Sequence, residues 1–230
     1  MLTTLTIVTL QPGTTRWGLA QMGTAPRQLQ RVPGLRFFKM LGSGYNFGLK
    51  PNFQRYALMA VWENPAAADT FFATHPLWLG YQQHSTETWT LHLAPLKAHG
   101  LWDGQNPFDY QTVPAPPDGP VAVLTRASIK LWKAPQFWRA VPATSAAFAQ
   151  AEGVRAAIGL GEIPVVRQAT FSVWESAASM QQYAYRGAAH KGVIQRTRQE
   201  KWYGEELFAR FTVLRSQGTL DGRNPLEGLI

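Results

Sequence analysis

The histidines are the residues of this chain best suited to bind a metal, because the sequence contains five of them and no cysteine. They stand at positions 75, 84, 92, 99 and 190, and none belongs to a His-x-x-x-His or Glu-x-x-His pair with helical spacing. A catalytic zinc needs three protein ligands, and this pattern offers no local set of three. Haem iron needs a single axial histidine, because the porphyrin supplies the equatorial nitrogens. The histidine pattern therefore suits haem better than zinc.

Two histidines are candidates for the axial position. If a helix begins near His190, Val193 and Ile194 follow at the third and fourth positions, so the imidazole would lie on an apolar face. His75 is the counterpart of His190 in the first half of the chain, just before Pro76. A hydrogen-bonded core histidine or a helix cap explains either residue equally well. The residues alone do not choose between the two halves.

Two glycine-rich stretches have a superficial likeness to phosphate-binding loops. GSGYNFG (Gly42–Gly48) and GLGEIP (Gly159–Pro164) lack the Lys-Ser/Thr pair of such loops, so we predict turns at both places. Because glycines and Pro51 favour irregular structure, we expect the segment Gly42–Phe53 to form a mobile lid.

The charge balance favours an anionic partner. Lys and Arg number 22 against 14 for Asp and Glu, which gives a net charge of +8. Such a surface suits an acidic protein, an anionic membrane or a polyanion, although solubility alone also explains it. Most aromatic residues fall within predicted strands and helices with few interleaved Lys or Arg, which argues against nucleic acid as the partner.

The N-terminal stretch MLTTLTIVTL reads as a strand. It lacks the basic n-region and the cleavage pattern of a signal peptide, and no stretch of the chain is long enough to span a bilayer. We therefore expect a cytoplasmic protein that at most lies peripherally on the inner face of the membrane.

Three blocks of sequence recur in the same order in the two halves of the chain. RYALMAVWENPAA (Arg55–Ala67) aligns without gaps on RQATFSVWESAAS (Arg167–Ser179), and LWDGQNP aligns on TLDGRNP. PGLRFFKMLGSG aligns more loosely on EGVRAAIGLGEI. Ordered recurrence at nearly constant spacing indicates an internal duplication, here of a unit too large for a solenoid.

Hydrophobic periodicity predicts the order β-α-β-β-α-β in each half. Asn64 and Ser176 are the expected N-caps of corresponding helices. The predicted strands are 2–10, 35–41, 56–62 and 88–96, then 121–131, 154–160, 168–174 and 207–214. The predicted helices are 15–30, 64–74 and 77–87, then 135–150, one starting at Ser176, and 191–200.

The chain therefore reads as an α+β protein made of tandem ferredoxin-like (βαββαβ) repeats. We predict a first repeat at 1–108, a Pro/Gly-rich linker at 109–119 and a second repeat at 120–230, which together form one compact unit. A four-stranded sheet with helices on one face leaves its other face uncovered. The two sheets should thus face one another or close partly into a barrel, with the helices outside.

Several separated motifs resemble the spheroidene monooxygenase family of carotenoid biosynthesis. They include GLWDGQNPF, GPVAVLTRASIK, IGLGEIPVVRQATFSVWE and WYGEELFARFTVLRSQGTLDGRNPL, and the resemblance runs from RWGLAQMG almost to the C-terminus. The resemblance implies an intrachain dimeric α+β barrel. It also implies a haem-dependent, oxygen-consuming ketolase that oxidises an acyclic carotenoid beside a methoxy end group, with electrons from a reduced ferredoxin.

The resemblance carries over to few individual residues. Haem proteins of this wider fold commonly bind iron through a histidine of the C-terminal half, which favours His190 in RGAAHKGVI as the metal ligand, with His75 as the alternative. Arg167, Gln168 and Trp174 fall in motif-like positions and are candidates for the cofactor pocket. No residue is assigned a role in bond breaking.

The expected partners follow from this chemistry. A polyene has almost no polar groups that could form hydrogen bonds, so an apolar groove must bind it. The positive surface would dock an acidic ferredoxin and an anionic membrane. Because fold does not settle function, two alternatives stay open: a non-catalytic haem or apolar-ligand binding protein, and a cofactor-free barrel monooxygenase.

Overall fold

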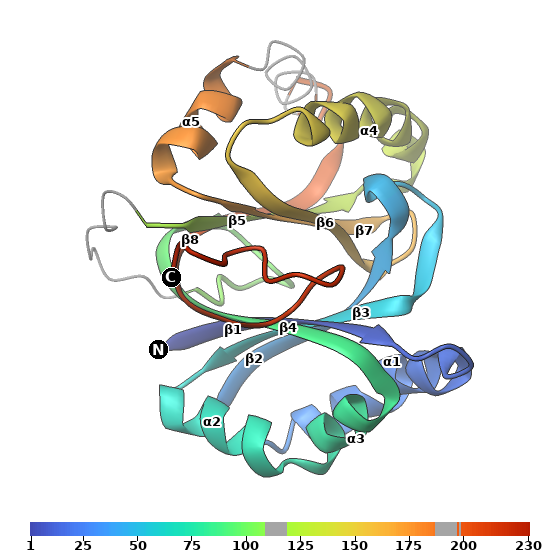
Figure 1. Cartoon of the computed structure of the whole chain (residues 1–230). Helices are drawn as coiled ribbons and strands as arrows, with labels where there is room; N and C mark the ends of the chain where they lie inside the picture. Colours follow the sequence, from blue (N-terminus) through green and yellow to red (C-terminus); the bar gives the residue numbers. More distant parts are fainter. Residues whose placement is uncertain (109–118, 187–196, 198) are drawn as a thin grey trace.

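The computed structural model describes residues 1–108, 119–186, 197 and 199–230 (Figure 1). The predicted order of elements is confirmed in both halves, as far as these residues extend. The first half comprises β1 (Leu2–Leu10), α1 (Thr15–Leu29), β2 (Leu35–Gly44), η1 (Tyr45–Phe47), β3 (Pro51–Trp62), α2 (Pro65–Thr74), α3 (Pro76–His84) and β4 (Ser85–Gly100). The second comprises β5 (Val121–Ile129), η2 (Leu131–Lys133), α4 (Ala134–Ala149), β6 (Val154–Ile163), β7 (Arg167–Trp174), α5 (Ala177–Arg186) and β8 (Tyr203–Gly218).

The eight strands close into one antiparallel barrel in the order β1-β3-β2-β6-β7-β5-β8-β4. Within each half, the first strand pairs with the third and fourth, as in a ferredoxin-like sheet. Two seams, β2–β6 and β4–β8, join the halves, and the fold predicted from the duplication is confirmed.

The two seams differ in length. Strands β4 and β8 pair along residues Trp89–Gly100 and Leu207–Gly218, whereas β2 and β6 pair only through Gly42–Gly44 and Gly159–Gly161. These glycines belong to strands, so the prediction of turns at Gly42–Gly44 and Gly159–Gly161 is wrong. Because glycine has no side chain, these positions instead suit the close approach of the two strands at the short seam.

The interior of the barrel is a packed core. Alternate residues of the strands point inward, and bulky side chains such as Trp89, Phe171 and Phe211 fill the centre. Leu220 and Leu226, from the segment after β8, complete this core. The barrel interior is therefore a source of stability rather than a ligand channel.

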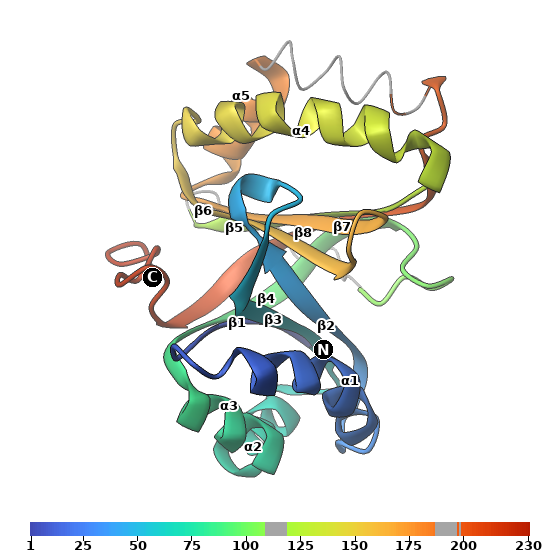
Figure 2. The ribbon, with the colours of Figure 1, turned by 90° about the vertical axis from the view of Figure 1, so that its right-hand side faces the viewer.

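The helices lie outside the barrel in two layers, with α1, α2 and α3 against the first sheet and α4 and α5 over the second (Figures 1 and 2). The predicted caps are confirmed, because Asn64 Oδ1 accepts a hydrogen bond from Ala67 N at 2.9 Å and Ser176 Oγ accepts one from Ser179 N at 3.2 Å. No helix in the described part of the chain is long and apolar enough to cross a membrane.

Three predictions fall wholly or largely outside the described residues. They are the linker at 109–119, of which residue 119 alone is described, the helix at 191–200 and the candidate ligand His190.

Candidate functional site

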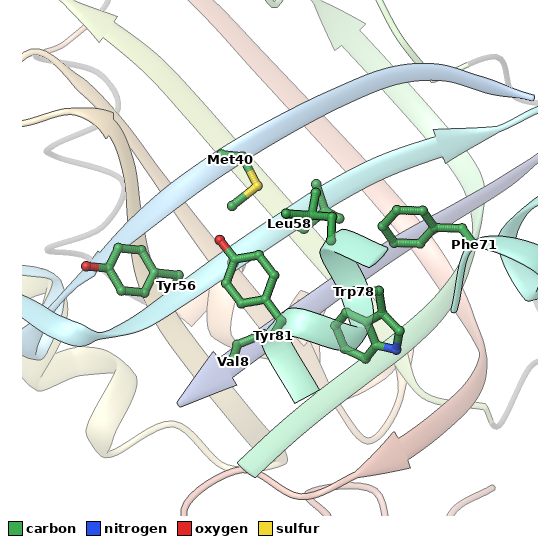
Figure 3. Close-up of a pocket in the computed structure, with 9 residues that line it drawn as sticks. Val8, Met40, Tyr56, Leu58, Phe71, Trp78 and Tyr81 are labelled. Atoms are coloured by element: carbon green, nitrogen blue, oxygen red, sulfur yellow. The ribbon is translucent and has the colours of Figure 1, made fainter. Parts of the chain in front are cut away.

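The space between the first sheet and its helices is filled. One row of residues, Met40, Leu58, Thr6 and Thr90, crosses the outer face of this sheet in register, and all four are buried. Figure 3 shows the aromatic side chains of this layer, to which α2 and α3 contribute. The cavity that they line measures only about 10 Å³, too small for a flat cofactor.

The corresponding row of the second sheet is open. It consists of Gly159, Thr170, Thr125 and Phe208, which pair in the same register, and none of them is buried. Thr125 is exposed although β5 lies between β7 and β8, whereas its counterpart Thr6 is 0% exposed. In the described part of the chain, this row is therefore accessible in the second half and buried in the first.

Aromatic side chains border the open row. Phe148 of α4, Trp174 of β7 and Tyr183 of α5 lie with ring centroids 4.8 to 6.0 Å apart. The indole Nε1 of Trp174 donates to Ser172 Oγ at 3.0 Å, and burial raises the pKa of Tyr183 to about 12. Trp174 is itself 1% exposed, so these three rings form an apolar core between the second sheet and its helices.

A groove begins where the open row meets the short seam. Its volume is about 330 Å³, within the usual range for ligand pockets. Leu19 and Met22 of α1 and Trp138 of α4 line it together with Phe53. The groove is therefore mostly apolar and draws on both halves of the chain.

Two residues connect the groove with the open row. Gly159 belongs to both, and Gln168 lines the groove from the same outer face of β7 as Thr170. The amide Nε2 of Gln168 donates to Ile163 O at 3.2 Å. Phe47 lies over Gly159, so the segment predicted as a lid, Gly42–Phe53, forms one wall of the groove; its movement stays a prediction.

Arg167 points elsewhere. It faces the inner side of β7, where its Nη1 lies 3.3 Å from Asp103 Oδ1 and 3.8 Å from Glu162 Oε2. Alternate residues of a strand point to opposite faces, so Arg167 cannot share the face of Gln168 and Trp174. The three motif-like candidates are thus divided between an ion-pair cluster and the open layer.

The ion-pair cluster closes one end of the barrel and is balanced in charge. Its centre is Arg126, whose side chain is 1% exposed and contacts Glu162 at 3.2 Å and Glu205. Burial alone would raise the pKa of Asp103, but the hydrogen bond and charge of Lys39, with Arg167 and Arg126, lower it overall. The three basic and three acidic side chains of this cluster form the barrel's polar end. Because their charges balance, the cluster has no net charge with which to bind a substrate. Its members are Lys39, Arg126, Arg167, Asp103, Glu162 and Glu205.

The repeated Asp-Gly motif has a structural role. Asp103 and Gly104 donate their backbone N–H groups to Glu205 at 2.9 and 2.8 Å, and Asp221 and Gly222 donate theirs to Glu87 at 3.0 and 2.7 Å. All four turn residues have positive φ, the conformation for which Asn, Asp and Gly are preferred in tight turns. Each turn is therefore held by a carboxylate of the other half.

Histidine 75 acts as a helix cap. Its Nδ1 accepts a hydrogen bond from Leu77 N at 3.3 Å, its ring stacks on Phe71 at 5.0 Å, and burial lowers its pKa. This arrangement and the filled layer leave no room for haem beside His75. Among the described residues no group of three His, Cys, Asp or Glu could hold a metal ion.

Comparison with known proteins identifies close relatives. No family profile matches the chain. Spheroidene monooxygenase of Rhodobacter capsulatus is 41% identical over 217 residues, which cover 93% of this chain and 90% of that protein. Spheroidene monooxygenase of Rubrivivax gelatinosus is 39% identical over 221 residues, 95% of this chain and 84% of that protein.

A solved structure has the same fold. It is the crystal structure of an aldoxime dehydratase in complex with butyraldoxime. The superposition covers 99% of this chain and 84% of the dehydratase chain, with a TM-score of 0.61 and 9% sequence identity. At this identity the likeness concerns the dimeric α+β barrel alone.

Proposed function

Because this chain belongs to the spheroidene monooxygenase family and is a monooxygenase, we propose that it uses haem and O₂ to introduce a keto group into an acyclic carotenoid, with electrons from a reduced ferredoxin. Each insertion of one oxygen atom into a C–H bond consumes one O₂, two electrons and two protons and releases one water. Two insertions at one methylene, followed by loss of water, give the keto group. Ferredoxin therefore supplies four electrons for each keto group formed.

The open row of the second sheet is the observation that carries the haem proposal. The first layer is filled, but Thr125, Thr170 and Phe208 remain accessible under α4 and α5. The apolar core formed by Phe148, Trp174 and Tyr183 would exclude water from one side of a porphyrin bound there. A one-ligand cofactor also fits a chain whose described residues offer no three-ligand metal site.

His190 is the proposed axial ligand. It follows the last residue of α5, Arg186, closely in the sequence, and it is the histidine of the half in which the layer is open. Haem bound there would supply the iron on which O₂ is activated. Thr125 and Thr170 would provide hydroxyl groups on the sheet side of the cofactor.

The groove at the short seam is the proposed binding site for the carotenoid. An apolar polyene is bound by contact area rather than by hydrogen bonds, and the groove offers Leu19, Met22 and Phe53 for this purpose. It leads to Gly159 and Gln168, at the edge of the open layer. The end of the substrate would thus enter the layer that we assign to haem.

A reconstituted turnover assay tests the proposed function. Full-length protein with haem, reduced ferredoxin, ferredoxin reductase and a methoxylated acyclic carotenoid in detergent should form a ketocarotenoid. Omission of haem or of ferredoxin should reduce the product to background. A haem spectrum without product would instead identify a haem-binding carrier, and product from metal-free protein would identify a cofactor-free monooxygenase; either result contradicts the proposal.

A further inference from the structure

Large apolar side chains are exposed beside the groove, on three loops and on the strand residues that flank them. Trp132 of η2 is 73% exposed and Leu49, between η1 and β3, is 55% exposed. The members of this apolar rim are Leu49, Phe53, Leu131, Trp132, Ile163 and Val165. Exposed apolar residues are ordinary when scattered, but a cluster beside a pocket marks an interaction surface.

The apolar rim is continuous with the groove. Leu49, Phe53 and Val165 line the groove directly. The turn between β6 and β7 is joined to the end of β5, which leads directly into η2, by a hydrogen bond from Ile129 N to Val166 O at 2.7 Å. In Figure 2 the hairpin that contains η1 and the turn between β6 and β7 lie on the side that faces the viewer.

The same loops carry positive charge only. Residues 45–55, 130–140 and 163–168 together contain six Lys or Arg and no Asp or Glu. Arg55, Lys133 and Arg167 form ion pairs with acidic residues from other segments. Lys50, Lys130 and Arg139 make no ion pair with any residue that the structure describes, so their charge is available to an anionic partner.

We propose that the apolar rim docks this enzyme on an anionic phospholipid bilayer, with the groove opening toward the acyl chains. Tryptophan, leucine and phenylalanine flanked by Lys and Arg are the side chains that enter the interfacial region of a membrane. Anionic headgroups would attract Lys50 and Lys130. A substrate dissolved in the bilayer would then reach the groove without crossing water. This surface rests on charge and exposure and does not depend on bound haem.

Vesicle binding tests this proposal on the full-length protein without haem or substrate. The probe is co-sedimentation with phosphatidylcholine vesicles that contain roughly one third phosphatidylglycerol, compared with pure phosphatidylcholine. We expect binding to the anionic vesicles that weakens as NaCl rises from about 0.05 M to about 0.5 M. A Leu131→Ser, Trp132→Ser variant should lose binding by roughly tenfold.

Leu214→Ser is the matched control, because Leu214 on β8 is 56% exposed and lies outside the three loops. It should bind as the wild type does. The proposal is overturned if the wild type does not bind, if it binds neutral vesicles equally well, or if Leu214→Ser loses as much as the rim variant. A dimer in sedimentation velocity that dissociates in the rim variant would also overturn it, since the rim would then bind a second copy.

Vesicle binding and the proposed function can fail separately. The rim variant should keep the turnover of detergent-dispersed carotenoid, because Leu131 and Trp132 neither line the groove nor lie in the open row. Loss of turnover in detergent with intact vesicle binding would count against the proposed function and leave the docking surface standing.

Discussion

At the scale of single residues, the filled layer and the open layer differ at one threonine position, which is Thr6 in the first repeat and Thr125 in the second. Thr6 Oγ1 lies 3.1 Å from Thr90 Oγ1 beneath the first helices, whereas Thr125 faces solvent. The sequence named Gln168 and Trp174 as pocket candidates, and in the structure both lie on the outer face of β7. It did not identify Thr125 or Phe208, because both are ordinary strand residues whose exposure depends on helices distant in the chain.

Comparison of the aligned repeats held a signal for the open layer. Leu58 of the first copy is replaced by Thr170, and Met40 by Gly159. Both changes remove apolar volume on the helix side of the second sheet. Arg167, by contrast, was predicted as a pocket residue from its motif-like position in the family resemblance. It forms an ion pair with Asp103, as its counterpart Arg55 does with Asp221.

Asp103→Asn should reveal the contribution of the ion-pair cluster. The pKa of Asp103 is lowered in the folded protein, so its stabilisation is complete above its ordinary value of about 3.9 and is lost as the pH falls toward the folded-state pKa. At pH 7 the substitution should lower the free energy of unfolding by about 1–2 kcal/mol. In urea unfolding, the difference between wild type and variant should shrink as the pH falls below about 3.9 and toward the folded-state pKa. A difference that stays constant from pH 7 to pH 3 would contradict this.

At the scale of elements, the strands and helices were largely predictable and their seams were not. The βαββαβ order follows from periodicity within each half, but β4 and β8 extend beyond the predicted 88–96 and 207–214 because they pair with each other across the halves. From the local sequence alone, the glycines of the short seam were predicted to be turn residues. Only the partner strand explains why they remain extended.

Gly159→Ala should disturb the short seam more than Gly42→Ala. A Cβ at Gly159 would lie 2.8 Å from Phe47 Cα, a backbone atom that can move only with the η1 hairpin, whereas at Gly42 the nearest atom is 3.8 Å away. We expect thermal and urea unfolding to show a loss of about 1–3 kcal/mol for Gly159→Ala and little change for Gly42→Ala. Equal effects of the two substitutions would mean that Phe47 does not pack on this glycine.

At the scale of the whole molecule, duplication produces a barrel whose halves have different roles. Each sheet covers the inner face of the other, and each half holds the Asp-Gly turn of the other through Glu87 or Glu205. The barrel was predictable, since a single four-stranded sheet would leave one face bare. The residues alone did not predict which half would hold a ligand, because His75 and His190 occupy equivalent positions in the two halves of the sequence. The filled first layer now favours the second half.

The visible absorption spectrum of the purified protein after haem supplementation tests the central claim most directly. It would be recorded for the wild type, Thr125→Trp, His190→Ala and His75→Ala, with thermal unfolding as the check on folding. The account predicts a Soret band of histidine-ligated haem in the wild type and in His75→Ala, and loss of that band in folded Thr125→Trp and His190→Ala. A band that survives in both of these variants, or that is lost only in His75→Ala, would contradict the assignment of haem to the second half.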